Sequence, residues 1–113
     1  MTTIALFANP GQTVRLVTQV LDGYTNERSD GYVPSVQSVY FPDQSRATGY
    51  PQNMSRIETG LYAHDIVLPT GNSALGTFTI SVFYQQPSTG MKIWELFLIN
   101  VARPFGNTSA SPL

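Results

Sequence analysis

The chain has 113 residues, of which 42% are hydrophobic and only 12% charged, and it contains no cysteine. Six basic and seven acidic residues nearly cancel, which excludes the strongly basic surface that binds nucleic acid or anionic membranes. The lack of cysteine excludes disulfides, a thiolate nucleophile and cysteine-based metal centres, while the length suits one hydrophobic core. The first residues lack the basic and long apolar segments of a secretory signal, so we expect none.

Nine glycines and eight prolines divide the chain into segments too short for ordinary helices, which favours β-strands. We expect the first strand at residues 3–8. The turn at 9–12 follows, where Pro10 and Gly11 suit the two central positions of a type II turn. Residues 14–20 then alternate between apolar and polar side chains, as in a strand with one buried face.

The middle of the chain is expected to be less regular. Residues 25–31 read as a polar loop. A strand is expected over 32–41, with Pro34 indicating an edge position or a bulge near its start. Residues 42–54 form the longest irregular stretch, which is typical of a specialised surface loop.

Three more strand patterns and a C-terminal arm complete the chain. A strand is expected from residue 61 to about 68, and residues 76–85 alternate most clearly, which predicts a central strand. The last strand is expected over 93–102, and residues 104–113 read as a flexible C-terminal arm. About seven strands and no helical pattern predict one all-β domain over residues 1–103, an immunoglobulin-like antiparallel β-sandwich, with a barrel as the alternative.

Four short motifs carry a resemblance to a known family. They are PGQTV at residues 10–14, DG at 22–23, TGLY at 59–62 and GTFTI at 76–80. Together they resemble bacterial and phage immunoglobulin-like domains of the macroglobulin-like type. By analogy of fold, the resemblance implies an accessory protein of a tailed-phage virion, such as a capsid decoration, neck or tail component, assembled in the host cytoplasm.

Two groups of residues carry side chains that could perform chemistry. His64 stands beside Asp65, but neighbouring residues on a strand point to opposite faces, so the two side chains are not expected to act together. Asp22, Glu27 and Asp30 surround one loop and could bind calcium, although aspartate is common in turns for conformational reasons alone. We therefore expect no catalytic residue, no metal site and no cofactor.

The last expected strand is apolar on both faces. A sandwich strand that has one face in water is normally polar on that face. Its even positions carry Trp94, Leu96 and Leu98. Two interpretations remain open: the loop at 42–54 covers this second face, or a partner protein does. The low proportion of charged residues favours a partner, since freely diffusing domains rely on surface charge to stay apart.

The sequence therefore predicts a non-enzymatic structural protein of a larger assembly. Its partners would be other proteins of that assembly, such as capsid, neck or tail proteins, or further copies of the chain, rather than nucleic acid or a membrane. The expected interface residues are Trp94, Leu96, Leu98, Pro104 and Phe105.

The alternative is a module that binds carbohydrate or a cell surface. In that case the side chains of Tyr24, Tyr32, Tyr50 or Trp94 would stack on sugar rings. The two hypotheses predict different observations: the module would bind glycans and lose that binding when Tyr50 or Trp94 is changed to alanine, whereas the structural protein would be incorporated into particles and lose occupancy in Trp94→Ala.

Overall fold

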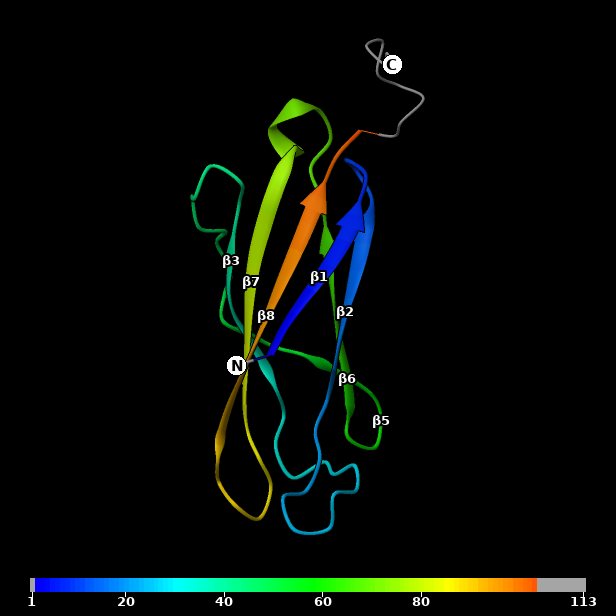
Figure 1. Cartoon of the computed structure of the whole chain (residues 1–113), viewed down its shortest axis with the longest axis vertical. Helices are drawn as coiled ribbons and strands as arrows, with labels where there is room; N and C mark the ends of the chain where they lie inside the picture. The colour runs from blue at the N-terminus through cyan, green and yellow to red at the C-terminus, as the bar shows by residue number, and fades with distance from the viewer. Residues whose placement is uncertain (1, 104–113) are drawn as a thin grey trace.

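The computed structural model describes residues 2–103, which form two β-sheets packed face to face (Figure 1). The larger sheet contains, in spatial order, β1 (Thr2–Ala8), β8 (Lys92–Val101), β7 (Gly76–Gln85), β3 (Ser35–Tyr40) and β4 (Gln52–Asn53). The smaller sheet contains β2 (Thr13–Gln19), β6 (Leu61–Val67) and β5 (Ser55–Glu58). A short 3₁₀ turn, η1 (Asn72–Ala74), precedes β7.

The all-β sandwich predicted from the sequence is confirmed, and the barrel alternative is wrong because the strands form two separate sheets. All strand pairs are antiparallel except β1 and β8, which run in parallel. The immunoglobulin-like type of the sandwich stays a prediction. No helix between residues 2 and 103 has both the length and the apolar character needed to cross a membrane.

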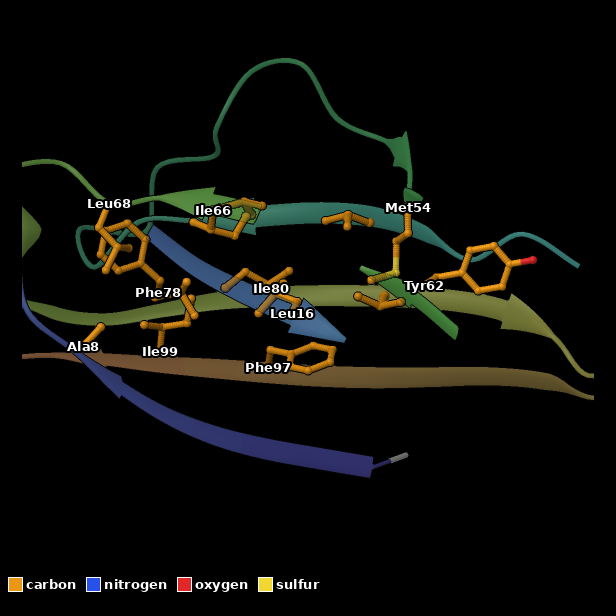
Figure 2. Close-up of a cluster of buried hydrophobic side chains, with 14 of the residues drawn as sticks. Ala8, Leu16, Met54, Tyr62, Ile66, Leu68, Phe78, Ile80, Phe97 and Ile99 are labelled. Carbon is orange, nitrogen blue, oxygen red and sulfur yellow. The ribbon is translucent and has the colours of Figure 1, made fainter. Parts of the chain in front are cut away.

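The core lies between the two sheets. It consists of the side chains that point inward at alternate positions along the strands (Figure 2). Leu16 of β2 contributes from the smaller sheet, while Phe78 and Ile80 of β7 and Phe97 and Ile99 of β8 contribute from the larger one. All five are at most 2% exposed. The alternation seen in the sequence of β2 and β7 therefore places each strand's apolar face correctly, and β7 is central, as expected.

The first turn also follows the prediction. Gly11 has φ +80°, and the Gln12 N–H donates to the Asn9 carbonyl over 3.2 Å. A positive φ is readily adopted by glycine at the second central position of a type II turn. This turn passes the chain from β1 in one sheet to β2 in the other.

Three strands differ from the prediction, one of which is β4, a strand of two residues inside the stretch 42–54 that was expected to be irregular. The strand expected over 32–41 begins only at Ser35, after Pro34, and its register shifts between Val36 and Ser38. Proline has no N–H for the ladder, which explains the late start. The short strand β5 was missed, because all four of its residues are exposed and no alternation marks it.

Candidate interaction surface

One side of the larger sheet faces away from the core. On this side, β8 carries no acidic or basic residue from Trp94 to Asn100, and neither do the positions of β1 and β7 that pair with these residues. We call this side the outer face; its members are Thr3, Ala5 and Phe7 of β1, Trp94, Leu96, Leu98 and Asn100 of β8, Thr77, Thr79, Ser81, Phe83 and Gln85 of β7, and Ser35, Ser38 and Tyr40 of β3. Within the described part of the chain, the charged side chains next to this face lie at its borders, at Lys92 and Arg46. Burying such a face requires little desolvation of charge.

The interface residues predicted in the last strand lie together on this outer face. Trp94 is 40% exposed, and Leu96 and Leu98 are half-buried beside it. The intervening residues Phe97 and Ile99 point into the core. The strand is thus apolar on both faces, and only one of the two faces is covered by the core.

The loop at 42–54 does not cover this face. It leaves β3 and returns as β4, at the edge of the larger sheet that is separated from β8 by β7 and β3. Its side chains Ala47 and Tyr50, together with the preceding Phe41, pack against the core between the sheets instead. The interpretation in which this loop covers the outer face of β8 is therefore wrong.

Three aromatic side chains form a row across one end of the outer face. The rings of Phe83 and Trp94 lie 4.8 Å apart between centroids, on directly paired positions of β7 and β8. Tyr32, just before β3, packs its ring edge to face against Phe83 at 6.2 Å. This arrangement anchors Trp94 on the sheet, because aromatic cross-strand pairs hold each other in place.

Phe7 and Phe83 belong to this surface and were not identified from the sequence. Phe7 is 80% exposed, the highest value among the large apolar side chains that the structure describes. Phe83 follows Thr77, Thr79 and Ser81 along the non-core positions of β7. The signal was present in the alternation of β7, since an aromatic residue stands where a solvent-facing strand position is normally polar.

Four polar side chains of the outer face bond to one another in two pairs. The hydroxyls of Ser38 and Ser81 lie 2.6 Å apart across β3 and β7. Thr77 donates to the Asn100 side-chain oxygen over 2.9 Å, across β7 and β8. Because these groups already have partners within the sheet, a docked surface would not leave them without hydrogen bonds.

The smaller sheet and its loops have a different character. The ion pairs of the described residues lie there: Arg15 with Asp65 at 2.9 Å, Arg28 with Glu58 at 2.6 Å and Arg56 with Asp30 at 3.0 Å. All of these side chains are substantially exposed. Charge is therefore segregated to one side of the sandwich, and the other side is left neutral.

Trp94 also borders a surface hollow where β1 begins beside β8. The hollow has a volume of about 300 Å³ and is lined by Thr2, Met91, Lys92, Ile93 and Trp94. Met91 is exposed as well. The end of the outer face thus combines an aromatic anchor with a concave surface, a combination that suits the centre of a protein contact.

His64 does not form a catalytic pair with Asp65. Its Nε2 lies 2.9 Å from the hydroxyl of Tyr50, and the two rings pack edge to face. Burial lowers the pKa of His64 below its usual value, which favours the neutral form of the ring. Asp65 lies on the opposite face of β6, where it forms the ion pair with Arg15.

The aspartates considered as calcium ligands bind separate protein partners. Asp22 accepts hydrogen bonds from the backbone N–H groups of Tyr24 and Thr25 and from the hydroxyl of Ser88. These bonds, chiefly that from Ser88, lower the pKa of its carboxyl group. Asp22 therefore connects the loop after β2 to the hairpin between β7 and β8.

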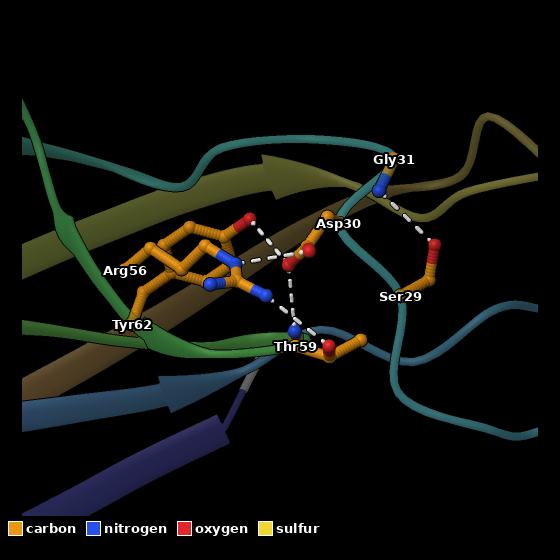
Figure 3. A network of polar contacts seen from close by, with 7 residues as sticks. Ser29, Asp30, Gly31, Arg56, Thr59 and Tyr62 are labelled. Atoms are coloured by element: carbon orange, nitrogen blue, oxygen red, sulfur yellow. Dashed lines mark hydrogen bonds and ion pairs between the residues drawn. The ribbon is translucent and has the colours of Figure 1, made fainter.

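Asp30 performs a similar function at the other end of the same loop (Figure 3). It accepts hydrogen bonds from the Gly60 N–H at 2.8 Å, from Arg56 at 3.0 Å and from the Tyr62 hydroxyl at 3.1 Å. The bond from Gly60, followed by those from Arg56 and Tyr62, holds the pKa of Asp30 below its usual value. Between residues 2 and 103, no three histidine, aspartate or glutamate side chains gather in a way that could hold a metal ion.

The aromatic residues considered for sugar binding do not share a flat surface. Tyr24 is exposed in a loop, while Tyr50 is engaged with His64. The ring planes in the row on the outer face meet at 49° for Phe83 and Trp94 and at 88° for Tyr32 and Phe83. A sugar ring stacks on one open aromatic face, whereas these rings are turned toward one another.

Pro104 and Phe105, the remaining predicted interface residues, and the arm at 104–113 lie outside the described residues. No family model matches the chain, and no curated protein matches it either.

Proposed function

We propose that this chain is a non-enzymatic structural protein of a larger assembly, and that it attaches to a protein partner through the outer face of its five-stranded sheet. The observation that carries the proposal is the neutral outer face, with Trp94, Leu96 and Leu98 following one another along β8, while the ion pairs of the described residues lie on the other side. Cores of protein interfaces are depleted of charged residues and enriched in aromatic ones.

The composition of this face supports a stable contact. Apolar area is supplied by β8 and by Phe7, and each residue of this kind contributes roughly 1.5–3 kcal/mol when fully buried. The flanking hydroxyl and amide groups are bonded within the sheet. A partner can therefore cover the surface without burying a charge and without separating these bonded polar groups from their partners, and both effects lower the cost of association.

The setting that fits the sequence resemblance is a tailed-phage virion, in which the chain would be a decoration, neck or tail component. A repetitive shell or ring presents the same protein surface many times, so one neutral face per subunit is enough for attachment. The non-enzymatic part of the proposal is supported by His64 and Asp65, which face opposite sides of β6, and by aspartates whose oxygens are bound to the protein.

The experiment is to purify particles assembled from the genome that encodes this chain and to quantify the chain in them by mass spectrometry. Trp94→Ala removes the aromatic ring at one end of the outer face, and Thr79→Lys places a charge at its centre. We expect each to reduce occupancy at least roughly tenfold, as for residues at the centre of an interface. Val17→Lys is the matched control, because Val17 is exposed on the smaller sheet.

Particles that lack the chain, or that incorporate the outer-face variants as well as the wild type, would refute the proposal. Binding to a glycan array that disappears in Trp94→Ala would also refute it and would favour the carbohydrate module. Circular dichroism first establishes that each variant is folded. A loss of occupancy is then interpreted as a loss of attachment only for variants that fold.

A further inference from the structure

Strand β1 is an edge strand, and along the side that faces away from β8 it has no partner strand among residues 2–103. It pairs in parallel with β8 along its whole length, from Thr2 opposite Glu95 to Ala8 opposite Val101. It ends the larger sheet, with no strand beyond it in the described residues. Such an edge carries a row of free backbone donors and acceptors that can accept another strand.

The free groups can be assigned from the hydrogen bonds of the strand. The Ala8 carbonyl accepts a hydrogen bond from the Ala102 N–H, so it points toward β8. Backbone groups point alternately to the two sides of a strand. The N–H and C=O groups of Thr3, Ala5 and Phe7 therefore point away from β8.

The sequence of β1 has none of the features that usually block an exposed edge. Its seven residues, TTIALFA, include no charge, no proline and no glycine. Natural edge strands are commonly shortened, bulged or marked with lysine or proline to prevent pairing. The other edges of the sandwich follow this rule, since β4 has two residues, β5 carries Arg56 and Glu58, and β2 carries Arg15.

The free groups of β1 are also symmetric about one residue. Thr3 and Phe7 lie two positions before and after Ala5, so an antiparallel copy of the strand places Ala5 opposite Ala5 and Thr3 opposite Phe7. All three positions then become hydrogen-bonded pairs, which gives about six backbone hydrogen bonds. A twofold axis at Ala5 satisfies the requirement that the same patch serves both subunits.

We propose that two copies of this chain pair through β1 in antiparallel register centred on Ala5, which joins their larger sheets into one continuous sheet. The pairing brings no like charges together, because the strand is uncharged. It covers Phe7, which is 80% exposed, with Thr3 of the second copy. Ile4 and Leu6, which are partly buried at the edge of the core, meet across the same junction.

The inference goes beyond the proposed function, because a monomer could attach to an assembly through the outer face alone. The two also depend on different groups, since pairing uses the backbone of β1 and attachment uses chiefly side chains of β7 and β8; Phe7 is the one side chain that takes part in both. In the paired form the two outer faces become one extended neutral surface. Failure of either proposal can therefore be observed without failure of the other.

The test uses the purified full chain in sedimentation equilibrium. The wild type is expected to pass from monomer to dimer as its concentration rises. Ala5→Lys and Ala5→Glu are each expected to remain monomeric, because the twofold axis sets two like charges face to face. An equimolar mixture of the two variants is expected to dimerise again, since lysine then faces glutamate.

The mixture is the decisive part, because only a register that places residue 5 opposite itself predicts rescue. Gln52→Lys serves as the control: it adds the same charge at β4, on the opposite edge of the same sheet, and is expected to dimerise like the wild type. A wild type that stays monomeric throughout would overturn the proposal. Dimers of the single-charge variants, or the absence of rescue in the mixture, would overturn it as well.

Hydrogen exchange gives an independent readout at the backbone. Dimerisation should slow exchange of the amides of Thr3, Ala5 and Phe7, which are free in the monomer. The amides of Ile4 and Leu6 point toward β8 and should be protected already at low concentration. A dimer that leaves the first three amides fast would show that the copies meet elsewhere and would contradict the proposal.

Discussion

The hydroxyl of Thr18 donates a hydrogen bond to a carboxylate oxygen of Glu95 over 2.8 Å, and this bond connects the two sheets through the interior of the sandwich. Thr18 lies on β2 and is 1% exposed, while Glu95 lies on β8 with its side chain on the core side. Burial raises the pKa of Glu95 above its ordinary value, although the bond from Thr18 opposes the shift. A titratable group is thus built into a layer that is otherwise almost entirely apolar.

The first prediction concerns Glu95→Gln. A carboxyl whose pKa is raised on folding stabilises the fold below its unfolded pKa, and this contribution is lost as pH rises through the folded value. Glutamine keeps an acceptor for Thr18 but never acquires the charge. We expect the variant to be at least as stable as the wild type at pH 8 and to lose that advantage at pH 4. Urea unfolding at both pH values measures the difference, and a pH-independent difference would contradict the explanation.

The second prediction concerns the donor of the same bond. Thr18→Val keeps the shape of the side chain but removes the hydroxyl, which leaves the buried carboxylate without this partner. The free energy of unfolding should fall by about 1–3 kcal/mol. Thr79→Val makes the same change on the outer face and should alter the free energy by less than about 0.5 kcal/mol. Similar losses at both positions would show that the bond does not contribute.

The strands with a strong alternation were predictable from the sequence, because burial on one side imposes it. Phe78, Ile80, Val82 and Tyr84 of β7 all face the core as predicted. The two-faced pattern of β8 likewise identified Trp94 and its neighbours as a surface with no cover from the core. In both strands, burial on one face decides at each position whether the side chain is apolar. The face on which each side chain lies can therefore be predicted from this sequence alone.

Other features depend on pairing between distant segments and carried no such signal. Strand β5 is defined by its hydrogen bonds to β6 and has no buried residue of its own. The parallel pairing of β1 with β8, which exposes Phe7 on the outer face, joins the two ends of the described chain. Alternation reports which side chains are buried, but it does not report which strands are neighbours.

The third prediction compares neighbouring residues of β8 that face opposite ways. Ile99 is fully buried between the sheets, whereas Leu98 is half-buried on the outer face. Ile99→Ala should lower the free energy of unfolding by about 2–5 kcal/mol, since it leaves a cavity in the core. Leu98→Ala should cost about 1 kcal/mol or less, because solvent fills the space. Denaturant unfolding of the two variants measures both, and equal losses would contradict the assigned faces.

The fourth prediction concerns Asp30, whose pKa is lowered first by the Gly60 N–H and then by Arg56 and Tyr62. A carboxyl with a depressed pKa stabilises the fold above its unfolded pKa, and the contribution is lost as pH falls. Asp30→Asn should therefore lower the melting temperature at pH 6 by several degrees and change it much less at pH 3. Thermal unfolding followed by circular dichroism checks this, and an equal loss at both pH values would argue against an ionic contribution.

The last prediction separates backbone conformation from available space at two glycines. Gly60 and Gly71 both have positive φ, +68° and +85°. A Cβ at Gly60 would lie 2.6 Å from Arg28 Cβ, 2.7 Å from the Ser29 nitrogen and 2.8 Å from the Val20 carbonyl oxygen, whereas at Gly71 no atom lies within 4 Å.

Alanine at Gly71 should therefore incur only the cost of a left-handed conformation, roughly 1–2 kcal/mol. Alanine at Gly60 adds steric overlap with backbone atoms, which cannot move away as a flexible side chain can. Because the Gly60 carbonyl accepts the Val20 N–H and its own N–H donates to Asp30, displacement also disturbs both bonds. We expect Gly60→Ala to lower the free energy of unfolding by more than about 3 kcal/mol, since overpacking adds to the conformational cost. Equal losses for the two variants in urea unfolding would show that conformation alone decides the cost and that the loop can move away from β6.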